Sequence, residues 1–492
     1  MLFNSLSFLI FFPLCIGVYY LLPKKLRAYF LLAASLFFYM CWNVAYGLLL
    51  VGTILITYIS GILITKYTDN PKIKKCIVAA GLFLNLGILF VFKYYDFFAG
   101  TFNKVLNTEN GISLLNLILP VGISFYIFQA VGYIIDVYRG REAEKNIVKY
   151  ALFVSFFPQL VAGPIERSGN LLNQINNLDK RNFFNEEDFV KGAFTMLYGY
   201  ILKMLIADRA AILVDTVFDP EKYSLFGGYE VILAAVLFSI QIYCDFAGYT
   251  YIAIGAARMM GFKLCRNFNT PYLSIGIKDF WDRWHISLSG WFRDYLYFPL
   301  GGSKKGKFRK YINILIVFLV SGLWHGASFH FVVWGGIHGI LRILDELTFK
   351  VRRKLKDKLH FNVSSFSGKA LGVGVTFFVV TLCWVFFRAS SSGQAIALIK
   401  SMFSDAHLWQ LTDSSLLNLG LDAKEMNVLI VFGLIMFIVD LATKKGKDVL
   451  ETIYRQDVWF KFLLMFAGII SIVIFGIYGT EYDAAAFIYF QF

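Results

Sequence analysis

Long apolar runs joined by short polar connections dominate this sequence of 492 residues. A helix needs about 20 mostly apolar residues to cross the hydrocarbon core of a membrane. Runs near that length recur along the whole chain, which predicts membrane-spanning helices throughout. The candidate spans lie near residues 4–22, 28–42, 44–65, 76–95, 112–136, 190–207, 228–258, 311–327, 328–345, 370–388, 426–443 and 459–479.

Composition supports this interpretation, since 58% of the residues are hydrophobic and only 16% are charged. Soluble globular chains carry about a quarter charged residues. The excess apolar surface must therefore face lipid. We predict an all-α fold, a polytopic membrane helical bundle of about 11–13 membrane segments. Residues 6–22 lack a basic leader region and a small-residue cleavage site, so we expect a retained first span and not a signal peptide.

The net charge of +14 is distributed in short basic stretches between the apolar runs. Basic residues in short loops hold membrane segments on the cytoplasmic side and lie well against anionic lipid. This distribution predicts membrane lipid as a partner and no nucleic acid, because no nucleic-acid-binding motif accompanies it. The preference of basic loops for the cytoplasmic side places the loop 389–425 outside the cytoplasm. It gives no orientation for residues 150–310. The stretches are Lys24–Arg27, Lys72–Lys75, Lys304–Lys310, Lys350–Lys358 and Lys444–Lys447.

One apolar segment, residues 147–166, is interrupted by Pro158, Gly163 and Pro164. Non-helical backbone at membrane depth persists only where it is buried in protein or lines a wet cavity. We therefore expect a buried or re-entrant element here. The six cysteines are scattered without metal-ligand spacing, so neither a disulfide framework nor a metal site is expected.

The region from Gln241 to Arg342 holds four of the six histidines. His325 ends an apolar run, and the pairs Gly322/Gly326 and Gly335/Gly339 have the small-xxx-small spacing that lets helices approach closely. A tightly held imidazole could accept a proton from a hydroxyl nucleophile. A core histidine bonded to a neighbouring carbonyl is the alternative, and the residues alone leave both open.

Residues 278–295 have the pattern of an amphipathic helix, at the membrane interface or lining a polar cavity. His285 is expected at the border between its apolar and polar sides, in a functional or a purely structural helix. Asp282, Arg283, Arg293 and Asp294 are expected to be ion-paired or solvated. The apolar stripe consists of Trp281, Trp284, Leu288, Trp291 and Tyr295.

The remaining polar candidates have structural interpretations. Asp245 lies between apolar flanks, where we expect it to pair with a basic residue or to accept hydrogen bonds from a helix end. His330 and His338 are expected to be bonded packing residues, and His360 and His407 fall in predicted loops. Residues 301–307 lack phosphate-loop spacing and predict a cytoplasmic turn, with contact to an acidic donor as the alternative. No Ser-His-Asp order or dinucleotide fingerprint occurs.

Several motifs together make the chain similar to the bacterial membrane-bound O-acyltransferases (MBOAT family), most of all to the alginate O-acetyltransferase branch. The match is most specific between about residues 157 and 340. The motifs are Phe157-Pro-Gln-Leu-Val-Ala-Gly-Pro-Ile165, Asp245-Phe-Ala-Gly-Tyr249, Asn267-Phe-Asn-Thr-Pro-Tyr272, Phe280-Trp-Asp-Arg-Trp-His-Ile-Ser-Leu-Ser289, Trp291-Phe-Arg-Asp-Tyr295, Pro299-Leu-Gly-Gly302 and Ser321-Gly-Leu-Trp-His-Gly326.

The resemblance implies helices around a central tunnel, with His325 as the catalytic histidine and His285 as a second functional histidine. It implies one MBOAT membrane domain over residues 1–492, with a core motif region at about 120–345, peripheral helices in 1–100 and C-terminal helices in 370–492. His325 would act as general base or carry the acyl group transiently. The cysteines and histidines suggest no metal, and the resemblance implies no bound cofactor.

By the same resemblance, an acyl thioester such as acetyl-CoA is the cytoplasmic donor substrate, and an extracytoplasmic polysaccharide or cell-wall polymer is acylated. An SGNH-esterase-like acyl acceptor protein, and in some systems an acyl carrier protein, would be partners at a bacterial inner membrane. D-alanyl transfer to teichoic acid is one alternative, although Pro299-Leu-Gly-Gly302 favours acetyl. A membrane transporter and a structural scaffold are alternatives of other classes.

Overall fold

A computed structural model describes residues 1–107, 111–161, 163–180, 184–360, 362, 364–413 and 415–478, with the backbone alone for 355 and 356. Every regular element in these residues is a helix, as predicted. Two compact units are present. The first comprises Met1–Met196 and Tyr249–Cys265, and the second Leu197–Gly248 and the described chain from Arg266 onward.

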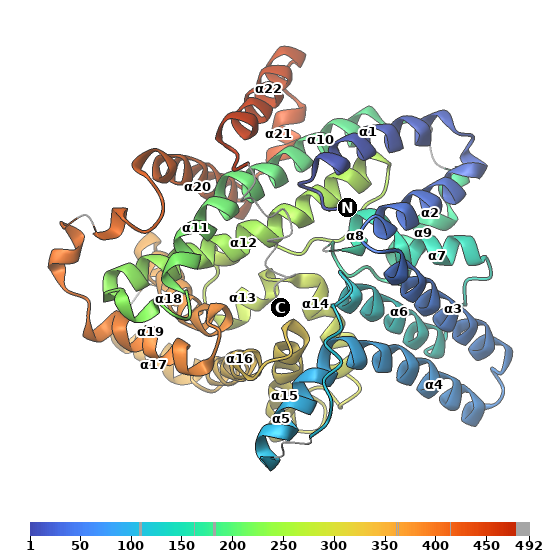
Figure 1. The fold of residues 1–492 in the computed structure, drawn as a ribbon, viewed down its shortest axis with the longest axis horizontal. Coiled ribbons are helices and arrows are strands. Elements are labelled where there is room, and N and C mark those ends of the chain that lie inside the picture. Colours follow the sequence, from blue (N-terminus) through green and yellow to red (C-terminus); the bar gives the residue numbers. More distant parts are fainter. Residues whose placement is uncertain are drawn as a thin grey trace. The chain divides into compact units, whose positions relative to one another are not determined.

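The first unit carries the N-terminal helices, and α3, α4 and α6 lie side by side within it (Figure 1). Its elements are α1 Leu6–Leu21, α2 Lys24–Met40, α3 Val44–Lys66, α4 Pro71–Leu89, η1 Phe90–Tyr94, α5 Tyr95–Leu106, α6 Ile123–Tyr138, α7 Ile147–Ser155, α8 Phe157–Leu160, η2 Ser168–Leu172, α9 Asn173–Asn176, η3 Leu178–Lys180 and most of α10 Glu186–Tyr200.

The second unit carries the motif-rich region and the C-terminal helices. Its elements are η4 Ile201–Ala207, α11 Asp208–Val217, η5 Tyr223–Leu225, the greater part of α12 Gly228–Met259, η6 Pro271–Leu273, α13 Ile277–Arg283, α14 Ile286–Phe292, η7 Arg293–Tyr297, α15 Lys307–His325, α16 Phe329–Leu347, α17 Phe349–Lys358, α18 Phe366–Arg388, α19 Ser392–Ser404, η8 Leu408–Leu411, η9 Ser415–Leu417, α20 Ala423–Lys444, α21 Val449–Tyr454 and α22 Val458–Phe475.

Six helical stretches in the described residues are long and apolar enough to cross a membrane: α3, Pro71–Leu106, α12, α18, α20 and α22. The expected spans near 4–22, 28–42, 311–327 and 328–345 are also helical, as α1, α2, α15 and α16. No residue of α22 is buried, although Trp459 and Phe462 are among its large apolar side chains. An apolar surface of that extent needs lipid around it, and the predicted polytopic membrane fold is confirmed.

The expected span 112–136 differs from the structure, because its helix begins only at Ile123. Gly122, at φ 75°, precedes it in a conformation that favours glycine. The irregular chain before it is bonded to side chains of the same unit. The carboxylate of Asp96 accepts from the amides of Leu115 and Asn116 at 2.7 and 2.9 Å. These long-range contacts replace helical hydrogen bonds and could not be predicted from apolar periodicity.

The interrupted segment is buried over residues 150–161 and 163–166, as expected. Helix α7 ends at Ser155, and the short helix α8 starts at Phe157 with Pro158 in its first turn. Proline is tolerated there because the first amides of a helix have no intrahelical partner. The side chains of α8 are all buried in the first unit.

Close backbone packing joins α15 to α16, which lie side by side in the second unit (Figure 1). A Cβ atom on Gly322 would overlap the carbonyl oxygen of Phe331, and one on Gly335 would overlap that of Phe318. The predicted role of these glycines is confirmed. The hairpin holds the end of α15, and with it His325, against the start of α16.

We expect Gly335→Ala to destabilise the protein by about 1–3 kcal/mol, because the added methyl group forces the two backbones apart. The neighbouring Gly336 faces only a Leu319 side-chain carbon at 3.4 Å, so Gly336→Ala is the matched control. Thermal unfolding of the purified variants in detergent measures the difference. Equal melting temperatures for the two variants would contradict the close contact.

Candidate active site

The segment 278–295 is not one helix, which corrects the sequence prediction. Helix α13 ends at Arg283, α14 starts at Ile286, and His285 between them has a left-handed φ of 43°. His285 therefore does not lie at a polar border. Its side chain is buried, with 1% of its surface exposed.

Contacts with Asn267 explain the break. The amide of Ile286 donates to the carbonyl oxygen of Asn267 at 2.9 Å, and the hydroxyl of Ser287 donates to its side-chain oxygen at 2.5 Å. The amide of Asn269 donates to the carbonyl oxygen of Arg283 at 3.0 Å. Tertiary hydrogen bonds thus take the place of helical ones at the carbonyl of Arg283 and the amide of Ile286. Periodicity carries no signal for these bonds.

Three of the predicted stripe residues are nevertheless buried, namely Trp284, Leu288 and Trp291. The charged residues form ion pairs, as expected. Asp282 pairs with Lys278, and Arg293 with Asp294, at 2.6 and 3.3 Å. Arg283 pairs with Asp279 at 2.7 Å.

The structure brings the two predicted histidines together. The ring centroids of His285 and His325 are 6.4 Å apart, and His325 is 4% exposed. The ring of Trp324 lies 5.9 Å from His285 and 5.0 Å from His325. Phe246 from α12 packs on His285 at 4.7 Å, and Phe387 from α18 packs on His325 at 5.3 Å. Two imidazoles therefore share one aromatic enclosure.

His325 is the last residue of α15. Helix C-termini carry partial negative charge, which stabilises a nearby cation. An imidazole that takes a proton from a hydroxyl group becomes such a cation. The position at the helix end therefore suits a general base.

His285 has different electrostatics, because burial lowers the pKa of its imidazole to about 3. The ring is thus neutral at physiological pH. A neutral imidazole has one donor and one acceptor nitrogen, so His285 can orient a bound group through hydrogen bonds.

The other histidines have packing roles or lie elsewhere. The indole N–H of Trp281 donates to Nδ1 of His338 at 3.3 Å, and His330 is bonded to the Ser328 hydroxyl at 2.8 Å. Trp334 lies between His325 and His338, at 5.1 and 5.0 Å from their rings. His360 follows α17 and His407 precedes η8, and neither contributes to the enclosure.

Asp245 has the basic partner that the sequence predicted, and the partner is Lys203. The ammonium group of Lys203 lies 2.7 Å from the Asp245 carboxylate and 2.8 Å from that of Asp208. Lys203 is fully buried in the π-helical turn η4. Sequence reasoning missed this lysine, although a lysine inside the expected span 190–207 was itself a signal.

We expect Lys203→Met to destabilise the protein by about 3–5 kcal/mol, because it leaves the buried carboxylate of Asp245 and the partly buried one of Asp208 without this cation. Lys222→Met is the control, since its pair with Asp219 is exposed and such pairs contribute about 0–1 kcal/mol. Thermal unfolding in detergent compares them. A Lys203→Met variant as stable as the control would mean that the carboxylates are protonated.

The described residues contain no group of three or more His, Cys, Asp or Glu side chains that could hold a metal ion. The chemistry derived for the site uses the imidazoles alone.

Comparison with known proteins identifies the family. Residues 144–392 match the model of MBOAT, the membrane-bound O-acyltransferase family, and both histidines lie inside that range. The chain is 38% identical to a protein of Pseudomonas putida named "Probable alginate O-acetylase AlgI", over 84% of this chain and 82% of the relative.

Two further relatives carry other names. The chain is 36% identical to a "Peptidoglycan O-acetyltransferase" of Helicobacter pylori, over 80% of this chain and 76% of that protein. It is 29% identical to a "Teichoic acid D-alanyltransferase" of Streptococcus thermophilus, over 58% of this chain and 71% of that protein. The resemblance seen in the motifs is confirmed, and the chain belongs to the membrane-bound O-acyltransferase family.

Proposed function

We propose that this protein transfers an acetyl group from a cytoplasmic thioester, acetyl-CoA, to a hydroxyl group of an extracytoplasmic polysaccharide or cell-wall polymer. The observation that carries the proposal is the pair of buried imidazoles, 6.4 Å apart, within an aromatic enclosure. The names of the alginate and peptidoglycan relatives support the class of acceptor.

In this mechanism His325 is the general base. Its imidazole takes the proton of the acceptor hydroxyl while the oxygen attacks the thioester carbonyl. The C–S bond then breaks and the thiolate leaves. His325 gives the thiolate the proton that it took from the hydroxyl group. The products are an acetyl ester and a free thiol, and the imidazole returns to its neutral form.

His285 is the orienting group. Because burial lowers its pKa to about 3, the ring stays neutral through the cycle. It would hold the thioester or the acceptor by a hydrogen bond, at a distance from His325 that one small acyl group can bridge. Orientation of reacting groups is a large source of rate enhancement.

The comparisons favour acetyl over D-alanyl as the transferred group. The O-acetyltransferase relatives are 36–38% identical over 80% or more of the chain. The D-alanyltransferase relative is 29% identical over 58% of the chain. By analogy with the family, the protein would act in the inner membrane of a bacterium. By the same analogy, its partner would be an extracytoplasmic SGNH-esterase-like acceptor protein.

We expect His325→Ala to reduce acetyl transfer by about 10²–10⁴-fold, the contribution of a positioned general base. Membranes containing the protein are given labelled acetyl-CoA, and label in extracytoplasmic polymer is measured. His330→Gln is the matched control, because His330 is a buried histidine on the adjacent helix. Full transfer by His325→Ala at normal protein levels would remove His325 from the mechanism. Solute flux without acyl transfer would favour a transporter.

A second prediction concerns the effect of His285 on kcat and on its pH dependence. His285→Asn should lower kcat by about tenfold or more, because an orienting hydrogen bond is lost. The acidic limb of the kcat profile between pH 5 and 8 should keep its midpoint, since a group with a pKa of about 3 does not titrate there. The profile is measured with labelled acetyl-CoA for both proteins. A shifted midpoint would assign His285 to proton transfer instead.

A further inference from the structure

Helix α17 (Phe349–Lys358) takes no part in the enclosure around His325 and has an unusual surface. Lys350, Arg353 and Lys354 are all exposed on its ten residues. Large apolar side chains are exposed beside them, including Phe349 at 59% and Val351 at 67%. In water such apolar side chains would be costly to expose, so α17 suits an interface between lipid and water.

Exposed apolar side chains also occur on the helix before α17. Leu344 and Leu347, in the last turn of α16, are 45% and 53% exposed. Apolar side chains are thus exposed on both sides of the junction between a helix expected to cross the membrane and the basic helix that follows. This position at the end of an expected span favours α17 at the membrane surface, with its cations at the level of the lipid headgroups.

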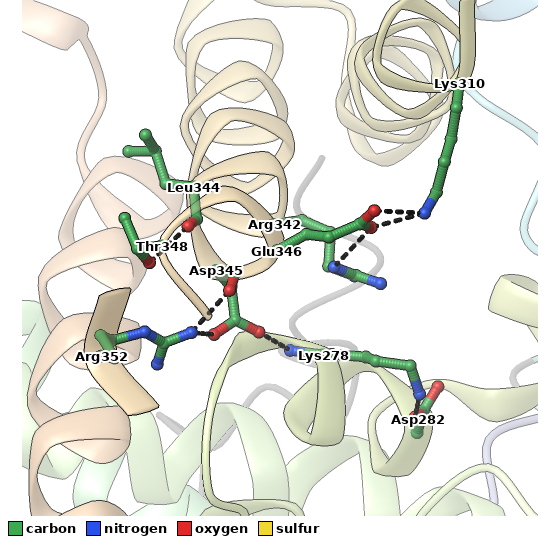
Figure 2. A network of polar contacts seen from close by, with 9 residues as sticks. All are labelled: Lys278, Asp282, Lys310, Arg342, Leu344, Asp345, Glu346, Thr348 and Arg352. Atoms are coloured by element: carbon green, nitrogen blue, oxygen red, sulfur yellow. Dashed lines mark hydrogen bonds and ion pairs between the residues drawn. The ribbon is translucent and has the colours of Figure 1, made fainter. Parts of the chain in front are cut away.

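A charged network joins α17 to Lys278 of α13 (Figure 2). The guanidinium of Arg352 donates to the carboxylate of Asp345 at 2.6 Å, and the other oxygen of that carboxylate accepts from the amide of Lys278 at 3.3 Å. Lys278 is in the first turn of α13, and α13 ends one residue before the Trp284-His285 break. Asp345 thus holds the start of α13 while Arg352 holds Asp345.

Neighbouring contacts in the same network have a different role. Lys310 of α15 donates to both carboxylate oxygens of Glu346 at 2.5 and 2.6 Å, and Arg342 lies 3.8 Å from that carboxylate (Figure 2). These bonds join α15 to α16 and make no contact with α13. Glu346 therefore serves as a control for Asp345.

We propose that α17 binds the anionic phospholipid headgroups of the leaflet it lies on, and that Asp345 is a positioning residue through which this contact sets the segment carrying His285. The regulatory half of this inference rests on the proposed function, whereas the lipid binding does not. Three exposed cations beside exposed apolar side chains match a surface that is both negative and apolar. A soluble acidic protein would match the cations alone.

The binding test uses energy transfer to fluorescent lipid. A dye is placed at Asp357→Cys after the exposed Cys41 and Cys76 are changed to serine. The full-length protein is reconstituted into vesicles of phosphatidylcholine that contain fluorescent phosphatidylglycerol or fluorescent phosphatidylcholine. We expect phosphatidylglycerol to be enriched at the dye, and the triple variant K350Q/R353Q/K354Q to reduce that enrichment at least about fivefold.

The matched control removes the same charge from another basic stretch. K304Q/K305Q/K307Q alters exposed lysines before and at the start of α15, and should leave the enrichment at position 357 unchanged. Equal enrichment in wild type and K350Q/R353Q/K354Q would overturn the proposal. This measurement needs no catalysis, so its failure is distinct from failure of the acetyl transfer.

The coupling test measures acetyl transfer from labelled acetyl-CoA with and without phosphatidylglycerol. Arg352→Gln should keep the lipid enrichment but lower kcat roughly tenfold, because the placement of His285 changes. Arg352→Lys should restore much of the rate, and Glu346→Gln should match wild type. An unaltered kcat for Arg352→Gln would overturn the coupling. K350Q/R353Q/K354Q could instead lose acetyl transfer in every lipid mixture while the enrichment of phosphatidylglycerol stays unchanged. That result would overturn lipid binding and assign the exposed surface of α17 to a soluble acidic protein.

Discussion

The backbone contact between α15 and α16 determines where His325 stands. At Gly322 and Gly335 the two helices are so close that no side chain fits between them. Helices in lipid gain no hydrophobic driving force from each other, so close packing of this kind is a main source of their association. The end of α15 is thereby fixed beside Trp334 of α16, 5.1 Å from the His325 ring. Gly322 and Gly335 thus hold His325, the proposed general base, in place.

Much of this arrangement could be predicted from the sequence, and the rest could not for identifiable reasons. The helical class, the glycine pairs and the buried segment around Pro158 follow from apolar length and residue size. The break at His285 depends on Asn267, about twenty residues away, whose backbone and side chain replace helical bonds. Lys203 was visible as a charge in an apolar run, yet only the fold pairs it with Asp245.

The buried ion pair and the histidine enclosure are adjacent through α12. Asp245 binds Lys203, and the next residue, Phe246, packs its ring on His285 at 4.7 Å. A buried charge pair is costly to form and costly to break. The Asp245–Lys203 pair therefore constrains the position of this part of α12. The ion pair at Asp245 and the aromatic contact at Phe246 thus constrain the same stretch of α12 at two consecutive residues.

His285 and His325 can have different roles in the proposed reaction because their surroundings differ. At a centroid separation of 6.4 Å, two imidazolium charges would repel each other by roughly 3 kcal/mol at an effective dielectric constant of 20. Only one ring can therefore hold a proton readily. His325 lies at a helix C-terminus that stabilises a cation, whereas His285 is enclosed by rings and kept neutral. In the proposed mechanism the proton is therefore held by His325, and His285 orients the reacting groups.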